Sequence, residues 1–178
     1  MPSFLIEEHK RYGIDCQNAI WATGEIKNFY NACGVNVLSD ADFAIETSDG
    51  LLLLIEYKNA MIPEARTHAC TGKDYDPEDK DKFNVLVKKF YDSLHYLRLF
   101  GKAKPIHYIC VLEYPNGDST SRKALRNRLK QQLPFELQKC HGTCVKLIES
   151  VDVMDIDGWN KHAVYGQFPI KPMEKQET

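Results

Sequence analysis

The chain has 178 residues, a formal net charge of -2, 43% hydrophobic residues and 27% charged residues. This length fits one domain with a sizeable core, and the composition is that of a folded globular protein rather than a disordered or membrane protein. The nearly balanced charge argues against a protein that coats nucleic acid by bulk electrostatics, although it leaves room for an enzyme with a local basic face.

The sequence shows neither a membrane span nor a signal peptide. Its longest purely apolar run, Leu51–Ile55, is far too short to cross a bilayer. Residues 1–13 are charged and lack the apolar stretch of a secretory signal. We therefore expect a cytoplasmic protein with no membrane partner.

The first half of the chain is predicted to contain two helical segments and three strands. Ile26, Phe29 and Tyr30 fall on one face of a helix that Gly34 ends. A tight turn at 48–50 leads into a run that is apolar on both faces, which is typical of a strand inside a covered sheet. The predicted elements are an amphipathic segment over 4–12, a helix over 17–32, and strands over 35–38, 43–47 and 51–57.

The second half begins with a polar, turn-rich segment over 59–81, and a loop of this length is commonly functional. Apolar residues at helical spacing then predict a long helix that Gly101 ends. The elements predicted here are a helix over 81–100, a strand over 108–112, a basic helix over 121–132 and a strand over 145–148.

This order of elements predicts an α/β fold in which helices flank a mixed central sheet. Tight connections make the first strands antiparallel, and a helical crossover allows a parallel pair. We expect one domain over 1–178.

Three charged residues stand where two of the predicted strands meet. Asp42 opens one strand, and Glu56 and Lys58 close the next. Side chains alternate along a strand, so Glu56 and Lys58 share a face, and the turn at 48–50 returns the chain toward Asp42. The sequence contains four E-x-K triplets, but only this one follows an apolar strand. A salt bridge at the edge of a sheet is the alternative interpretation of the pattern.

An acid, a second acid and a lysine suit phosphodiester hydrolysis. Two carboxylates bind Mg²⁺ through oxygen and leave positions for water and a phosphate oxygen. The ion polarises the phosphate and lowers the pKa of bound water. A lysine nearby orients that water or neutralises charge that develops on the phosphate.

Asp42, a spacer of thirteen residues and then Glu56-Tyr57-Lys58-Asn59 resemble the motif of the PD-(D/E)xK nuclease superfamily, the restriction-endonuclease-like fold. Gly24-Glu25 before a helix, followed by residues 34–37, is similar to the first core helix of Holliday-junction resolvases. The resemblance implies an α-β-β-β-α-β core over about 17–115, with a C-terminal extension over 116–178 that adds a helix and a strand.

The resemblance also implies an activity and its residues. The activity is cleavage of nucleic acid, with DNA favoured, by an Mg²⁺-dependent or Mn²⁺-dependent endonuclease or exonuclease of restriction, repair or defence. Catalysis would fall to Asp42, Glu56 and Lys58, with Glu25 assisting from the helix. The metal would be held at Asp42, Glu56 and Tyr57. Many such nucleases act as homodimers.

Two departures from the family pattern leave alternatives open. The proline that usually precedes the first acid is Ala41 here. Asp40 lies two residues before Asp42, on the same face of an extended chain, and could be the ligand instead. We prefer Asp42 because the apolar strand starts directly after it. A nuclease fold that binds nucleic acid or protein without cutting is the second functional hypothesis.

Basic residues in two other segments are candidates for contacts with phosphates. Arg122, Lys123 and Arg126 belong to the basic helix, which could equally be a solvated face. Arg66 and Lys73 lie in the 59–81 segment, which we expect to act as a lid over substrate.

A third hypothesis is a metal centre built from cysteine. Cys140 and Cys144 flank His141, but a second pair with the spacing of a structural zinc site is missing. Free thiols are therefore the preferred interpretation.

Overall fold

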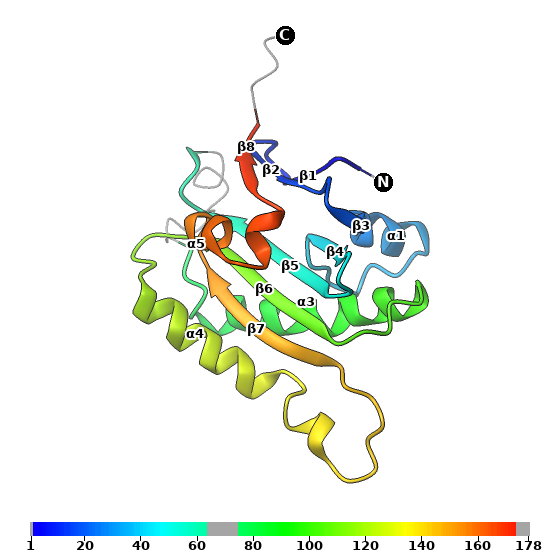
Figure 1. Ribbon diagram of the computed structural model, residues 1–178. Coiled ribbons are helices and arrows are strands. Elements are labelled where there is room, and N and C mark those ends of the chain that lie inside the picture. Colours follow the sequence, from blue (N-terminus) through cyan, green and yellow to red (C-terminus); the bar gives the residue numbers. More distant parts are fainter. Residues whose placement is uncertain (1, 64–74, 174–178) are drawn as a thin grey trace.

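A computed structural model describes residues 2–63 and 75–173 (Figure 1). At its centre lies a five-stranded sheet with the strand order β3-β4-β5-β6-β7. The pairs β3–β4 and β4–β5 are antiparallel, whereas β5–β6 and β6–β7 are parallel. The strands are β3 (Ala19–Thr23), β4 (Phe43–Thr47), β5 (Leu52–Asn59), β6 (Ile106–Glu113) and β7 (Ile148–Met154). The predicted α/β fold with a mixed sheet is thereby confirmed.

The position of β5 in the middle of the sheet explains why its sequence is apolar on both faces. Leu52 and Leu54 belong to one buried cluster, and Leu53 and Ile55 belong to another on the opposite side of the sheet. Burying a leucine or isoleucine side chain contributes about 1.5–3 kcal/mol, so this run fixes the sheet at the centre of the protein.

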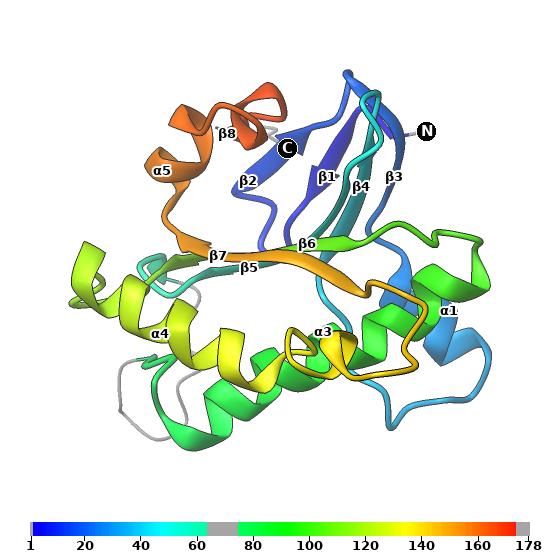
Figure 2. The ribbon, with the colours of Figure 1, turned by 60° about the horizontal axis from the view of Figure 1, so that its bottom comes forward.

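Helices cover one face of the sheet, and a second, smaller sheet covers the other (Figure 2). The covering helices are α1 (Ile26–Ala32), α3 (Lys80–Leu99) and α4 (Ser119–Gln132). On the opposite face lie β1 (Phe4–Ile6), β2 (Tyr12–Asp15), β8 (Ile170–Pro172) and α5 (Ile156–Lys161), together with the short 3-10 helix η2 (Tyr165–Gln167). A further 3-10 helix, η1 (Leu137–Lys139), follows α4.

The long helix α3 matches the predicted helix over 81–100. Asp79 caps its first turn by accepting hydrogen bonds from the backbone N–H groups of Asp81 (3.0 Å) and Lys82 (3.3 Å). Gly101, with a φ of 71°, follows its end. In the part of the chain that is described, no helix is long and apolar enough to cross a membrane.

The amphipathic segment predicted over 4–12 is wrong, because these residues contribute to the β1–β2 hairpin. The carboxylate of Glu7 accepts hydrogen bonds from the backbone N–H groups of His9 (2.7 Å), Arg11 (2.5 Å) and Tyr12 (3.2 Å). These bonds satisfy backbone N–H donors of the hairpin turn. A pattern of apolar residues at helical spacing does not reveal such a turn.

The helix predicted over 17–32 is only half correct. Residues 19–23 form β3, which pairs with β4, and the helix α1 begins only at Ile26. The strand predicted over 35–38 is also wrong, since Val37 is 80% exposed in a loop. The third antiparallel strand is therefore β3, and it precedes the first core helix rather than following it.

The C-terminal third completes the central sheet. The strand predicted over 145–148 lies later in the chain, at β7, and α4 packs against it. The elements α5 and β8 were not predicted; α5 contributes the fully buried Trp159 to the second core, whose indole N–H donates to the carbonyl of Phe168 (2.7 Å).

Candidate active site

The predicted acid, acid and lysine lie around one cavity. Asp42 stands directly before β4, and Glu56 and Lys58 stand near the end of β5, on the face that the helices cover. All three line a cavity of about 500 Å³. Its other charged lining residues are Glu7, Glu8, Asp40, Lys27 and Lys89, and His9 also contributes. Five carboxylates and three lysines therefore line the cavity, which leaves an excess of two negative charges when all are ionised.

Lys89 of α3 joins the two carboxylates. Its Nζ lies 2.8 Å from both Oε1 and Oε2 of Glu56 and 3.8 Å from Oδ1 of Asp42. Only 6% of the Glu56 side chain and 20% of the Lys89 side chain are exposed. Asp42 and Glu56 thus converge on a single cationic group at the bottom of the cavity.

The main chain holds Asp42 in this position. The N–H group of Tyr57 donates a hydrogen bond of 2.7 Å to Oδ2 of Asp42, which ties the start of β4 to the end of β5. The segment before Asp42 is fastened to α3, because the N–H group of Ser39 donates to Asp92 (2.6 Å) and that of Ala41 donates to Ser93 (2.8 Å). Asp42 is therefore fixed from two sides.

The pKa values at the site reflect burial and an excess of acids. Burial, together with the neighbouring charge of Asp42, raises the pKa of Glu56 to about 8. Burial also raises the pKa values of Asp42 and Asp40, and the charge of Lys89 partly offsets both shifts. Burial alone would lower the pKa of Lys89, but the charges of Glu56 and Asp42 more than compensate and raise it.

Lys58 lies at the mouth of the cavity, beside the turn of the β1–β2 hairpin. Its Nζ is 3.4 Å from the carboxylate of Glu8, whose side chain is 70% exposed. An exposed ion pair of this length contributes at most about 1 kcal/mol. The Lys58 ammonium is therefore held weakly and has freedom to contact a ligand.

Glu25 and Tyr57 do not take the positions that the family resemblance implies. Glu25 is exposed at the start of α1, where it accepts a 2.6 Å hydrogen bond from Asn28, and it is not among the residues that line the cavity. The phenol of Tyr57 points to the second core on the opposite face of the sheet, and its buried hydroxyl has no hydrogen-bond partner among the described residues. Only the main chain of Tyr57 reaches the site.

The donor chemistry at the cavity fits a hard divalent cation, since Asp42 and Glu56 offer carboxylate oxygens. In the arrangement described, the ammonium of Lys89 lies where the two carboxylates converge. Within residues 2–63 and 75–173, no group of three or more His, Cys, Asp or Glu side chains is placed as a ligand set for a metal. Two carboxylates with water would be a typical set for Mg²⁺.

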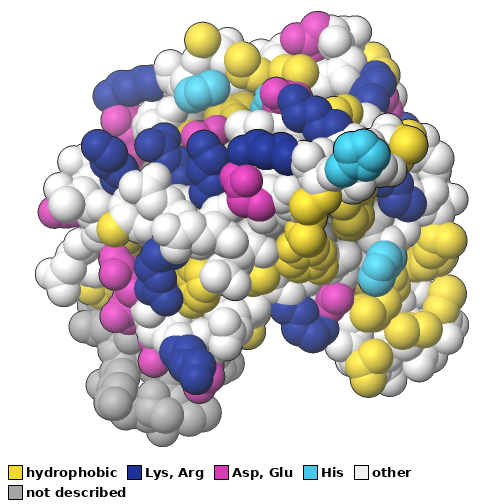
Figure 3. All heavy atoms as spheres, turned by 90° about the horizontal axis from the view of Figure 1, so that it is seen from below, with side chains coloured by type: hydrophobic (Ala, Val, Ile, Leu, Met, Phe, Trp, Pro, Cys, Tyr) yellow, Lys and Arg dark blue, Asp and Glu magenta, His cyan; other side chains and the backbone are white. Residues whose placement is uncertain are grey.

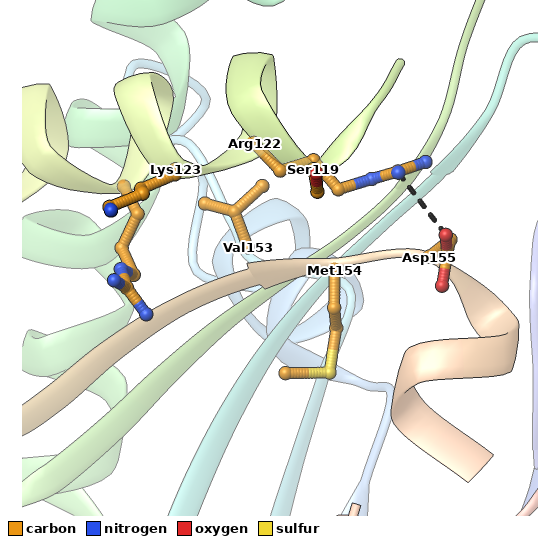
Figure 4. Close-up of a pocket in the computed structure, with 7 residues that line it drawn as sticks. Ser119, Arg122, Lys123, Val153, Met154 and Asp155 are labelled. Atoms are coloured by element: carbon orange, nitrogen blue, oxygen red, sulfur yellow. Dashed lines mark ion pairs between the residues drawn. The ribbon is translucent and has the colours of Figure 1, made fainter. Parts of the chain in front are cut away.

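The predicted basic helix α4 borders a second cavity, of about 320 Å³, against the end of β7 (Figure 4). Arg122 extends toward Asp155 and forms an ion pair of 3.1 Å, while Lys123 lies on the other side of the cavity. Arg126 pairs with Asp152 at 3.8 Å. Lys and Arg side chains gather in a row on this face of the molecule (Figure 3), but acids of β7 and the segment after it neutralise part of their charge.

The remaining candidates lie elsewhere. Arg66 and Lys73 fall outside the described residues, together with the middle of the predicted lid. Cys140 and Cys144 are exposed free thiols in the segment between η1 and β7.

Sequence reasoning missed two contributions to the cavity. Lys89 could not be distinguished by pattern from Lys82 and Lys88 of the same helix, although a buried lysine needs a partner. Glu7 and Glu8 were assigned to an amphipathic segment, which hid their place in a hairpin turn beside the site.

Comparisons of the chain with protein-family models, curated proteins and solved structures give no match. The fold and the cavity therefore assign the protein to a broad class only: an α/β protein with a mixed five-stranded sheet and an acidic cavity at the C-terminal end of the central strand β5.

Proposed function

We propose that this protein is a metal-dependent nuclease that hydrolyses phosphodiester bonds in nucleic acid, with DNA as the favoured substrate. The observation that carries the proposal is the convergence of Asp42 and Glu56 on one cationic position, with Lys58 lining the same cavity. The excess of negative charge among the lining residues favours binding of a cation there, and a bound cation would in turn attract a phosphate.

Each residue would have a distinct role. Asp42 and Glu56 would hold Mg²⁺ or Mn²⁺, and the main chain of Tyr57 would keep Asp42 in place. When bound, the ion would polarise the phosphate and acidify a water molecule. Lys58 would orient the attacking water or neutralise charge on the phosphate. Asp40 is a further carboxylate on the same cavity and could replace Asp42 as a ligand.

Substrate would extend beyond the cavity. Lys123 and Lys130 are exposed on α4 and are candidates for contacts with phosphates, and Arg122 and Arg126 could join them by exchanging their acidic partners. Such contacts would position the strand and add a salt-dependent contribution to affinity.

A second candidate function is a module that binds nucleic acid or protein without cutting. The observation that favours it is the ion pair of Lys89 with Glu56, which already supplies a cation to the carboxylates. If Lys89 stays in place, the cavity has no room at that position for a metal.

The direct test is incubation of the purified protein with single-stranded and double-stranded DNA and RNA in the presence of Mg²⁺, Mn²⁺ or EDTA. We expect cleavage of DNA with either metal and none with EDTA. A Glu56→Gln preparation serves as the control for contaminating nucleases. Equal cleavage by both preparations, or none by either, would contradict the proposal and favour the module that does not cut.

A further inference from the structure

The position of Lys89 sets a condition on any cation that binds at the cavity. Its Nζ is equally distant, at 2.8 Å, from both oxygens of Glu56, and it lies 3.8 Å from Asp42. A cation shared by the two carboxylates would occupy this same region. Two positive charges cannot occupy it together, because their repulsion at such short range is severe in a poorly solvated site.

The charge of Lys89 also compensates the buried carboxylate of Glu56. Glu56 is almost fully buried, and an ionised carboxylate without a partner is costly in such an environment. Lys89 supplies the partner from a rigid helix, since Leu86 and Phe90 on either side of it along α3 are packed in the core. One ammonium faces two carboxylates, so the pair keeps a net negative charge, which would attract a cation of higher charge.

The side chain of Lys89 borders open space. Its ammonium ends a flexible four-carbon stem, and the residue lines the cavity of about 500 Å³. A change of rotamer would move the charge from Glu56 into this space while α3 stays packed.

We propose that Lys89 is an internal counter-ion, which occupies the cation position between Glu56 and Asp42 and must withdraw into the cavity before a divalent metal binds. The inference rests on the proposed metal site. Withdrawal would move the ammonium away from the cation position and into the cavity, where a phosphate of the substrate would reach it. Lys89 would thus lower the affinity of the empty site for metal and become available to the substrate only in the loaded site.

Mn²⁺ binding, measured by isothermal titration calorimetry on the full chain, tests this competition. Lys89→Met removes the competing charge, and Lys82→Met is the matched control, because Lys82 is an exposed lysine of the same helix. We expect Lys89→Met to bind Mn²⁺ at least about tenfold more tightly than wild type, since removal of a neighbouring positive charge strengthens the attraction. Lys82→Met should bind as wild type does.

Loss of the ammonium could also unfold the variant, so a second measurement uses the wild-type protein. Amine acetylation, mapped by mass spectrometry with and without Mn²⁺, reports the accessibility of each lysine. We expect the acetylation of Lys89 to increase when Mn²⁺ binds, while that of Lys82 stays constant.

The possible outcomes separate the two proposals. If wild type binds Mn²⁺ and neither the affinity of Lys89→Met nor the acetylation of Lys89 changes in the expected direction, the counter-ion role is overturned and the metal site survives. If Lys89→Met folds and neither it nor wild type binds Mn²⁺, the metal site fails, and the counter-ion role fails with it.

Discussion

The two ends of β4 carry acidic clusters with opposite balances of charge. At one end, Glu46 faces two lysines, with Lys102 Nζ at 2.6 Å and Lys104 Nζ at 2.8 Å. At the other end, Asp42 and Glu56 share the single ammonium of Lys89. Hydrogen bonds from Lys102 and Lys104 lower the pKa of Glu46, whereas burial raises that of Glu56.

This contrast distinguishes a structural ion pair from a candidate site. An acid with two basic partners is satisfied within the protein and has little to gain from a ligand. Two acids that share one basic partner keep a net negative charge, which favours the binding of a further cation. Such groups cluster at functional sites because function, rather than stability, maintains them.

The largest expected effect is on cleavage. Asp42→Asn, Glu56→Gln and Lys58→Ala should each reduce the rate of DNA cleavage by at least about a hundredfold with the fold intact, because each removes an interaction with the transition state. Glu46→Gln removes a carboxylate from the other cluster and should leave the rate unchanged. Single-turnover cleavage measures both, and wild-type rates in all three site variants would assign the activity to another origin.

The carboxylate variants should differ from the lysine variant in metal binding. Asp42→Asn and Glu56→Gln remove oxygen charge from the proposed ligands and should weaken the binding of Mn²⁺, whereas Lys58→Ala should not. Titration calorimetry of the three variants measures this difference. Equal weakening in all three would place Lys58 among the groups that support the metal.

The dependence of stability on pH should separate the two clusters. The pKa of Glu56 in the folded protein, about 8, exceeds its ordinary value of 4.5. The stability that Glu56 contributes is therefore complete below about pH 4.5 and is lost as the pH rises through about 8. Glu56→Gln should gain stability relative to wild type over this window, by at most about 1.4 kcal/mol per pH unit.

Glu46 should show the opposite sign. Its pKa is lowered in the folded protein, so its contribution is present above about pH 4.5 and is lost as the pH falls through the lowered value. Glu46→Gln should cost at most about 1 kcal/mol near neutral pH, and the difference from wild type should vanish in acid. Urea unfolding of wild type and both variants, from acid to about pH 8, measures how the stability difference of each variant from wild type changes with pH. Changes of equal sign for the two variants would contradict the comparison.

The smallest expected effect concerns α4. Lys123→Ala with Lys130→Ala should weaken DNA binding about equally for all sequences and reduce the slope of log affinity against log salt by about 1 for each lysine. Fluorescence anisotropy in Ca²⁺ measures the slope without cleavage. An unchanged slope would show that α4 is a solvated face.

Local patterns in the sequence were sufficient for much of the fold and for the proposed acids and lysine. The apolar run of β5 and the stripe of α3 are strong signals, and strand parity correctly placed Glu56 and Lys58 on one face. The pairing of residues 19–23 with β4 was hidden because Ile20 is exposed on an edge strand and also fits a helical pattern. Lys89 could not be selected from sequence, since its partner Glu56 lies 33 residues away.

The location of a bound metal tests the central claim most directly. Crystals soaked in Mn²⁺ and measured at the manganese absorption edge would show each bound ion as a peak of anomalous density. We predict a peak between the carboxylates of Asp42 and Glu56, with the Lys89 ammonium moved away from it. A well-occupied peak elsewhere, such as between Cys140 and Cys144, or no peak while Lys89 remains on Glu56, would contradict the account.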